Sequence, residues 1–510
     1  MMKNFLRTAG VFVVYMISSA HVGSPDTWFE GDAGPYHLTV QIEPAGVVPG
    51  VAKVFVRATG DAPQQVTIQA NKFDATGGAP PPEPAVPVPG DPGLFEGKLW
   101  IMSSGSNSVT VAVNGTKGSG KVVVPAVVVA YSRLKLDKPM GAGLAVMGIF
   151  LIAGLVTIVG AAVRESVLPP GDAPSANTQK RARVAMSITS VLLAAAIFGG
   201  WKWWNSEDAS YVRGIYKPLS AVAAVDQSSP SPGLKLSITD GPWIHRNDSL
   251  WLSRHGGNGW TPLVEDHGKL IHIFLIGERT AAFAHLHSAT RDSVNFPASL
   301  PPLPADNYRV FADIVHESGF THTMVTSVSV ADPVKGQTFT SSDPDDSFFT
   351  GNPARTASRA ILDDGSTMDW LGQNSHPAAG KPADLRFEIR RADGSRVVLE
   401  PYMGMAGHAV VERADGTVFV HLHPTGTISM ASQMAFAMRQ PGDTIKGRLG
   451  MRISEAEMSQ MQHAVPANGA VSFPYAFPRE GPYNVWVQVR YDGSVHTCRF
   501  MMSVKAAPAT

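Results

Sequence analysis

Two stretches of the chain share one pattern and decide how it folds: HIFLIGERTAAFAHLH, residues 272–287, and HAVVERADGTVFVHLH, residues 408–423. In each stretch a first histidine is followed by two more, thirteen and fifteen residues later. Further along, YRVFADIVHESGFTHTMVTSVSV (308–330) matches YNVWVQVRYDGSVHTCRFMMSV (483–504) once one residue is removed. Similarity at constant offsets indicates that the chain contains a duplicated structural unit.

Strand geometry predicts that the histidines of each copy converge. In a His-x-His strand both imidazoles leave the same face, because side chains alternate along a strand. Asp415-Gly416 is a hairpin turn signal. A two-residue turn there sets His408 opposite His423, whereas a four-residue loop centred one position earlier pairs His408 with His421. In either case three histidines share one sheet face, and the same argument covers the earlier copy: His272, His285 and His287.

Three convergent neutral imidazoles suit zinc or copper, and nearby thioethers favour copper. The later copy supplies Met403 and Met405 in PYMGMAGH, beside His408. Met-x-Met next to a histidine is a common pattern at extracytoplasmic copper sites. Strand parity puts Met403 and His408 on opposite faces, so a shared ion would require a bulge at Gly404 or Gly407. The alternatives are that the methionines only fill the core and that the histidines are structural.

The N-terminus predicts a secretory signal peptide over residues 1–20. Lys3 and Arg7 precede an apolar stretch over 9–17, and Ser18-Ser19-Ala20 suits cleavage. Cleavage after Ala20 would expose His21, whose amine and ring could form a copper-binding histidine brace with His37. An uncleaved N-terminal anchor is the alternative.

Two apolar runs predict transmembrane helices, Met140–Val163 and Val184–Trp204. Lys202 lies among three tryptophans, which is typical of an interfacial belt. The loop between the runs, 164–183, is basic and therefore predicted to be cytoplasmic. We expect a protein of the bacterial inner membrane whose globular domains all face the periplasm or the cell exterior.

Composition narrows the function. Lys and Arg together number 42, as do Asp and Glu, so the formal net charge is zero and nucleic-acid binding is not expected. Plentiful glycine and proline with few charged residues favour β-sandwiches over helical bundles. The single cysteine, Cys498, excludes an internal disulfide. No nucleophile with an evident base stands out, so we do not expect an enzyme.

We expect three β-domains along the chain, which cover 21–138, 226–332 and 359–505, with helices at 139–163 and 184–204 between the first two. An apolar segment, Leu219–Val225, is expected to lie on the membrane or to continue as a helix. Residues 333–358 read as a linker. The third domain has one expected helix, Ser454–His463, because Ser454 and Glu457 form a capping box.

These motifs resemble the YtkA-like family of small extracytoplasmic domains. The resemblance rests on GKLIHIFLIGERTAAFAHLH, FADIVHESGF, MGMAGHAVV and FVHLHPTG, and covers most of 226–332 and 381–505. It implies immunoglobulin-like β-sandwiches and an association with copper or respiratory oxidases. The first domain, opening HVGSPDTWFEGDAGPYHLTV, resembles the N-terminal part of bacterial membrane proteins of this architecture. The earlier copy departs from the pattern, since Ser288 and Lys269 stand where the later copy has Pro424 and Met405.

The sequence therefore predicts copper binding outside the cytoplasm, for delivery, sequestration or sensing, with a copper-handling or oxidase-assembly protein as partner. A protein that docks partners through its β-sandwiches without metal is the alternative. A copper-dependent oxidative enzyme built on His21 is a third hypothesis.

Overall fold

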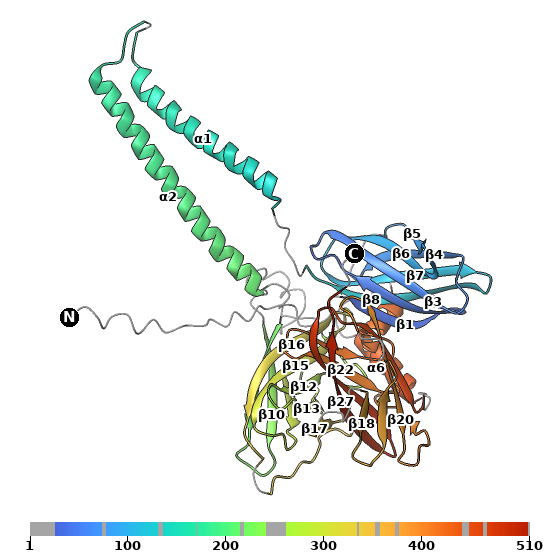
Figure 1. Cartoon of the computed structure of the whole chain (residues 1–510). Coiled ribbons are helices and arrows are strands. Elements are labelled where there is room, and N and C mark those ends of the chain that lie inside the picture. The colour runs from blue at the N-terminus through green and yellow to red at the C-terminus, as the bar shows by residue number, and fades with distance from the viewer. Residues whose placement is uncertain are drawn as a thin grey trace. The chain divides into compact units, whose positions relative to one another are not determined.

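The computed structural model describes residues 26–73, 78–130, 136–169, 171–214, 219–240, 262–333, 336–351, 358–372, 377–440, 448–462 and 467–507. The chain forms two compact units, one of residues 1–131 with 216–510 and the other of residues 132–215. The predicted signal peptide and His21 lie outside the described residues. The fold is mainly β, with sandwich domains of the predicted class and two apolar helices between the first and second domains (Figure 1).

The first domain is an antiparallel sheet of order β1-β2-β3-β6-β5-β4-β7-β8. Alternate residues of its strands point inward and form one continuous apolar core, as period-two patterns predict. Its strands are β1 Thr27–Ala33, β2 Tyr36–Glu43, β3 Gly50–Thr59, β4 Gln65–Lys72, β5 Glu83–Val88, β6 Asp91–Ile101, β7 Gly105–Gly115 and β8 Gly118–Val128.

The two apolar runs are helices, α1 Lys138–Glu165 and α2 Ala176–Gly214, and both are long and apolar enough to cross a membrane. The helices extend beyond the predicted spans, so the connection between them is shorter than the predicted loop of 164–183. They pack against each other at Gly160, where an added Cβ would lie 2.6 Å from the sulfur of Met186. Lys202 lies 5.3 Å from the ring centroid of Trp201.

The second domain packs two sheets around one core. The expectation of a helix or membrane segment at 219–225 is wrong, because these residues form a strand that pairs with β10 along its whole length. The predicted linker also contains a strand, whose Ser347 pairs with His285. The first sheet is β9 Leu219–Asp226, β10 Gly233–Asp240 and β14 Asn295–Ser299. The second is β11 Leu263–Val264, β12 His272–Gly277, β13 Phe283–His287, β15 Asp306–His316, β16 Thr321–Val330 and β17 Ser347–Phe349.

The third domain repeats this sandwich. One sheet comprises β18 Arg359–Ile361, β19 Thr367–Trp370, β20 Pro382–Arg390 and β25 Ala470–Ala476. The other comprises β22 His408–Arg413, β23 Phe419–Leu422, β26 Gly481–Tyr491 and β27 Ser494–Val504, while β21 Val398–Leu399 pairs with β24 Ala467–Asn468. Cys498 is buried in the core between the sheets.

In the described part of the third domain two helices interrupt the sandwich, where one was expected: α5 Met430–Met438 and α6 Arg448–Gln462. Helix α5 is capped by Ser429, whose hydroxyl accepts a hydrogen bond from the backbone N–H of Ser432. Helix α6 begins before Ser454, so the capping box does not mark its start. Burial of Leu449 and Ile453 extends the helix towards its N-terminus.

Equivalent faces of the second and third domains pack on each other through an aromatic layer. Phe311 stacks on Phe419 with centroids 4.0 Å apart and rings 7° from parallel. The equivalent residues, Trp486 and Phe283, stack at 5.2 Å and 17°. Because the same pair occurs twice with the repeats exchanged, the two domains are related by a pseudo-two-fold axis (second domain green to yellow, third domain orange to red in Figure 1).

Residues 425–428, which follow His423 in the third domain, contact the first domain. Residue Glu30 donates its backbone N–H to the carbonyl of Thr425 at 2.9 Å, and Thr427 donates to the carbonyl of Trp28 at 3.0 Å. Ile428 joins the core of the first domain. The three β-domains therefore form one unit around the repeat interface.

Candidate metal centre

The two hairpins place their six histidines side by side at the repeat interface. In the second domain His272 lies directly opposite His287. In the third domain Val410 lies opposite His421 and Ala409 opposite Leu422, which sets His408 level with His423. This is the register that the two-residue turn predicts. All six are buried: His272, His285, His287, His408, His421 and His423.

The three histidines of the second domain point one nitrogen each at a common centre. The Nδ1 of His272 lies 3.1 Å from the Nε2 of His285 and 3.3 Å from the Nε2 of His287. Zinc and copper bind imidazole nitrogen at about 2.0–2.1 Å, so tetrahedral ligands stand roughly 3.3–3.4 Å apart. The spacing of these nitrogens is therefore close to that of ligands around one ion.

The outward nitrogen of each ring faces an acceptor. His272 Nε2 lies 3.2 Å from the carbonyl oxygen of Asp266, His285 Nδ1 lies 3.0 Å from Oε1 of Gln488, and His287 Nδ1 lies 3.0 Å from Oδ1 of Asp346. Since each acceptor takes the ring N–H, a neutral ring keeps its lone pair on the inward nitrogen. Three lone pairs then face one another, an arrangement that a bound cation relieves.

A second group joins the third domain to a histidine of the second domain. Ligand nitrogens of His267, His408 and His423 all lie within 4.8 Å of one another. The His267 ring centroid is 5.2 Å from that of His408 and 4.9 Å from that of His423. His423 Nδ1 lies 3.0 Å from the carbonyl oxygen of Ile428 and donates its N–H there. The lone pair that could bind a metal is then on Nε2. Neither ring nitrogen of His408 has a hydrogen-bond partner among the described residues, whereas the ring of His267 contacts the backbone of Met403.

His421 lies between the two groups. Its ring centroid is 5.2 Å from that of His272 and 5.3 Å from that of His408. Its Nδ1 is 3.6 Å from a carboxylate oxygen of Asp313. His421 and its repeat counterpart, His285, are 5.6 Å apart, so the pseudo-two-fold axis passes between them.

Burial keeps five of the clustered histidines neutral: His267, His272, His285, His408 and His423. Burial, reinforced by the neighbouring imidazoles, holds the pKa of His272, His285, His408 and His423 well below the usual range. Burial also lowers the pKa of His267. Neutral imidazole is the form that binds a metal, so these rings need not lose a proton at neutral pH before they bind.

Carboxylates surround the centre, and two of them face a lysine. His287, Asp343 and Asp346 form a third group of potential ligands. The ammonium of Lys269 lies 2.6 Å from both carboxylate oxygens of Asp343 and 3.0 Å from Asp345. Because a cation already balances these charges, we assign Asp346 the role of orienting His287 rather than of binding a second ion.

Helices α5 and α6 of the third domain pack over the turn that contains His267. Asp266 accepts a hydrogen bond from the backbone of Ala431 at the start of α5, at 3.0 Å. Glu457 of α6 is fully buried beside Gly268. Burial, together with the charge of Asp266, raises the pKa of Glu457 far above its usual range, so this carboxyl is protonated at neutral pH.

The remaining predicted site residues lie elsewhere. Met403 is buried at a left-handed turn position rather than in the strand of His408, and Met405 is half-buried at the end of that turn. The turn removes the need for the bulge that strand parity required. His37 is partly exposed on β2, where Nδ1 contacts Asp32 at 2.7 Å. Its proposed partner, His21, lies outside the described residues. His267 was not predicted, because a lone turn histidine gives no sequence signal for contacts with another domain.

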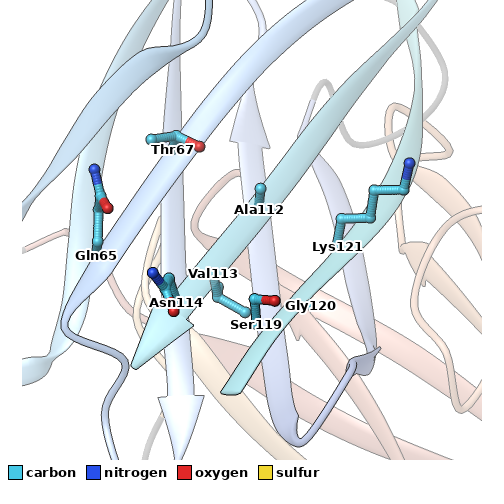
Figure 2. Close-up of a pocket in the computed structure, with 8 residues that line it drawn as sticks. All are labelled: Gln65, Thr67, Ala112, Val113, Asn114, Ser119, Gly120 and Lys121. Carbon is cyan, nitrogen blue, oxygen red and sulfur yellow. The ribbon is translucent and has the colours of Figure 1, made fainter. Parts of the chain in front are cut away.

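A hollow of about 410 Å³ lies on β4, β7 and β8 of the first domain (Figure 2). Small and polar residues line it, and Lys121 is the one charged residue among them. Its lining contains no histidine and no carboxylate.

Comparisons with known proteins identify no activity. Residues 360–506 match the model of a family described as a domain of unknown function, DUF8832. No curated protein matches the chain. An engineered protein is 19% identical, with a TM-score of 0.15, over 18% of this chain and 20% of its own. Dimeric latent PorU from Porphyromonas gingivalis is 10% identical, with a TM-score of 0.14, over 95% of this chain and 34% of its own. A putative membrane anchored protein from Corynebacterium diphtheriae is 9% identical, with a TM-score of 0.14, over 95% and 96%.

Proposed function

We propose that this chain is a membrane-anchored metal-binding protein that holds copper between its second and third β-domains. The observation that carries the proposal is the set of inward nitrogens of His272, His285 and His287, spaced 3.1 and 3.3 Å apart. Each outward nitrogen has its own acceptor, as is usual for histidines that bind metal. The same spacings of 3.1 and 3.3 Å also suit hydrogen bonds between neighbouring rings, and that structural alternative is what the metal measurement decides.

We favour copper over zinc because Met403, which is buried and whose backbone contacts His267, brings a soft thioether to this region. Hard cations such as calcium and magnesium prefer oxygen ligands and do not suit these donors. Zinc is the competing ion. The role that follows is binding for delivery, sequestration or sensing, with a copper-handling or oxidase-assembly protein as partner. The resemblance to YtkA-like domains agrees with this role.

The helices α1 and α2 supply the anchor. Residues 1–131 and 216–510 form one compact unit, so both must lie on the same side of the membrane that the helix pair crosses. We propose that this side is the periplasm or the cell exterior, since basic residues flank the connection between the helices: Arg164, Lys180, Arg181 and Arg183.

The test measures metal bound by the whole chain in detergent. The protein is loaded with excess copper, passed over a weak chelator and desalted, and its copper is determined by mass spectrometry. We expect stoichiometric copper, and loss of at least one ion in the double variant His285→Gln/His287→Gln. His496→Gln, a histidine of the third domain that stacks on Tyr491 and belongs to neither group, is the matched control and should leave the copper content unchanged.

Two results would contradict the proposal. A native chain without retained metal, or a double variant with native copper content, would remove it. In either case the variant must have the far-ultraviolet circular dichroism spectrum of the native chain, which shows that it is folded. A chain that stays folded without metal would then favour the alternative, a docking protein.

A further inference from the structure

The turns that precede the two histidine hairpins have the same backbone conformation and the same hydrogen-bond pattern. His267-Gly268 has φ of 55° and 74°, and Met403-Gly404 has φ of 50° and 77°. Each turn is closed by a reciprocal pair of backbone hydrogen bonds, at 2.9 and 3.0 Å in the second domain and at 2.8 and 3.1 Å in the third. Met403 therefore occupies the position of His267 in the repeat.

His267 serves the opposite domain. Its ring lies 5.2 Å from His408 and 4.9 Å from His423 of the third domain, against 6.2 Å from His272 of its own domain. The turn thus crosses the interface and adds a third imidazole to a pair from the other repeat. His267 is fully buried there.

By the pseudo-two-fold symmetry, Met403 stands in the same relation to the second domain as His267 does to the third. The exchange of repeats that maps Phe311–Phe419 onto Trp486–Phe283 also maps His408 and His423 onto His272 and His287. It therefore brings Met403 towards the histidines of the second domain. Met403 is 3% exposed, as a residue inside the interface must be.

We propose that the cluster holds two copper ions in chemically different sites, each completed by the turn of the opposite domain. The first site is all imidazole, from His408, His423 and His267. The second combines His272, His285 and His287 with the thioether of Met403. This inference rests on the proposed function and adds to it the number of ions and their ligands.

The two donor sets select different oxidation states. A thioether is a soft ligand and stabilises Cu(I), whereas an all-imidazole site binds Cu(I) but also accepts Cu(II) or zinc. The chain therefore carries one site suited to reduced copper beside one suited to the oxidised ion. Because each site takes donors from both domains, bound metal also ties the repeats together.

Reciprocal substitutions test the assignment with little risk to folding. His267→Met and Met403→His exchange residues that the fold already accepts at equivalent turn positions. Met405→Leu, two residues from Met403 and only half-buried, is the matched control. Each full-length variant is loaded with Cu(I) in detergent, its copper is counted, and sulfur ligation is measured by X-ray absorption.

We expect about two copper ions per chain in all four proteins, with about one sulfur ligand per two ions in the native chain and in Met405→Leu. Met403→His should remove the sulfur signal, and His267→Met should roughly double it. Competition with a Cu(I) chelator should show that Met403→His weakens one site by about tenfold or more.

The outcomes separate the two proposals. Copper bound without sulfur ligation in the native chain would overturn the role of Met403 and leave metal binding intact. One ion per chain would overturn the pair of sites. A sulfur signal that persists in Met403→His and disappears in Met405→Leu would assign the thioether to Met405 instead. Absence of all metal would remove the proposed function itself.

Discussion

At the scale of single residues, the polar groups behind the histidines decide what the cluster can bind. Gln488 lies on the central strand of the third domain, yet its Oε1 accepts the ring N–H of His285 from the second domain. The Gln488 amide also donates to the hydroxyl of Ser347, which fixes which end faces the histidine. A ligand whose tautomer is set from the opposite domain depends on the assembled interface.

Gln488→Leu should lower copper affinity by about 10–100-fold, because His285 loses the acceptor that orients it. The measurement is competition with a chelator of known affinity, on the full chain in detergent. Gln69→Leu, at a half-buried position of β4 in the first domain, should leave the affinity unchanged. An unaltered affinity in Gln488→Leu would show that His285 needs no orienting partner.

Residue patterns predicted part of this site. Two observations were enough to predict three imidazoles on one sheet face. These were the spacing of His272, His285 and His287 and the alternation of side chains along a strand. They could not reveal His267, whose partners come from another domain, or the acceptors Gln488 and Asp346, which are distant in sequence. Contacts between domains leave no periodic trace in a single chain.

At the scale of elements, the hairpin that carries these histidines is held at its loop by one carboxylate. Asp306, at the start of β15, accepts backbone hydrogen bonds from Arg279 at 2.9 Å and Thr280 at 2.8 Å. Its side chain is 1% exposed. Burial alone would raise the pKa of Asp306, but these hydrogen bonds and the Arg279 guanidinium lower it to about 2.

Asp306→Asn should destabilise the β unit by on the order of 2 kcal/mol at neutral pH. The folded pKa lies below the unfolded value, so the stabilisation is complete above pH of about 4 and is lost as pH falls towards 2. The difference between native and variant chains should therefore shrink over that range. Urea unfolding followed by tryptophan fluorescence checks this, with the exposed Asp61→Asn as control. A difference independent of pH would contradict the ionic explanation.

Elements whose pattern was ambiguous were the ones predicted wrongly. Leu219–Val225 is short and apolar, which fits a strand as well as a helix, and only pairing with β10 decides between them. Helix α5 is amphipathic over too few residues to stand out. Its stability depends on the Ser429 cap and on packing against the second domain. The hairpin strands of the repeats were predicted from the spacing of their histidines, and the structure contains them at 272–277, 283–287, 408–413 and 419–422.

At the scale of the whole molecule, the two apolar helices α1 and α2 interrupt a single folded unit. Residues before α1 and after α2 meet in hydrogen bonds such as that from Ser106 to the carbonyl of Ser318. Both flanks must therefore reach the same compartment before the unit can fold. The helix pair is an insertion into the unit rather than a tether at its end.

Single-cysteine labelling should reveal this topology. Burial raises the pKa of the Cys498 thiol, which is 2% exposed, so the native chain should react slowly with an impermeant maleimide. Cysteines placed at the exposed positions Asp61 and Asp393 should label in intact spheroplasts, whereas Asp172→Cys, between the helices, should label only after lysis. The reverse pattern would place the β-domains in the cytoplasm.

The pseudo-two-fold axis between His285 and His421 has a consequence for the ancestry of the chain. An interface that pairs the same surface of two like domains is the isologous kind that homodimers form. A relative with a single copy would therefore have to associate with itself and would close two identical centres. Fusion of two such genes into one reading frame would have freed each half to diverge, and that freedom is what allows a histidine on one side to face a methionine on the other.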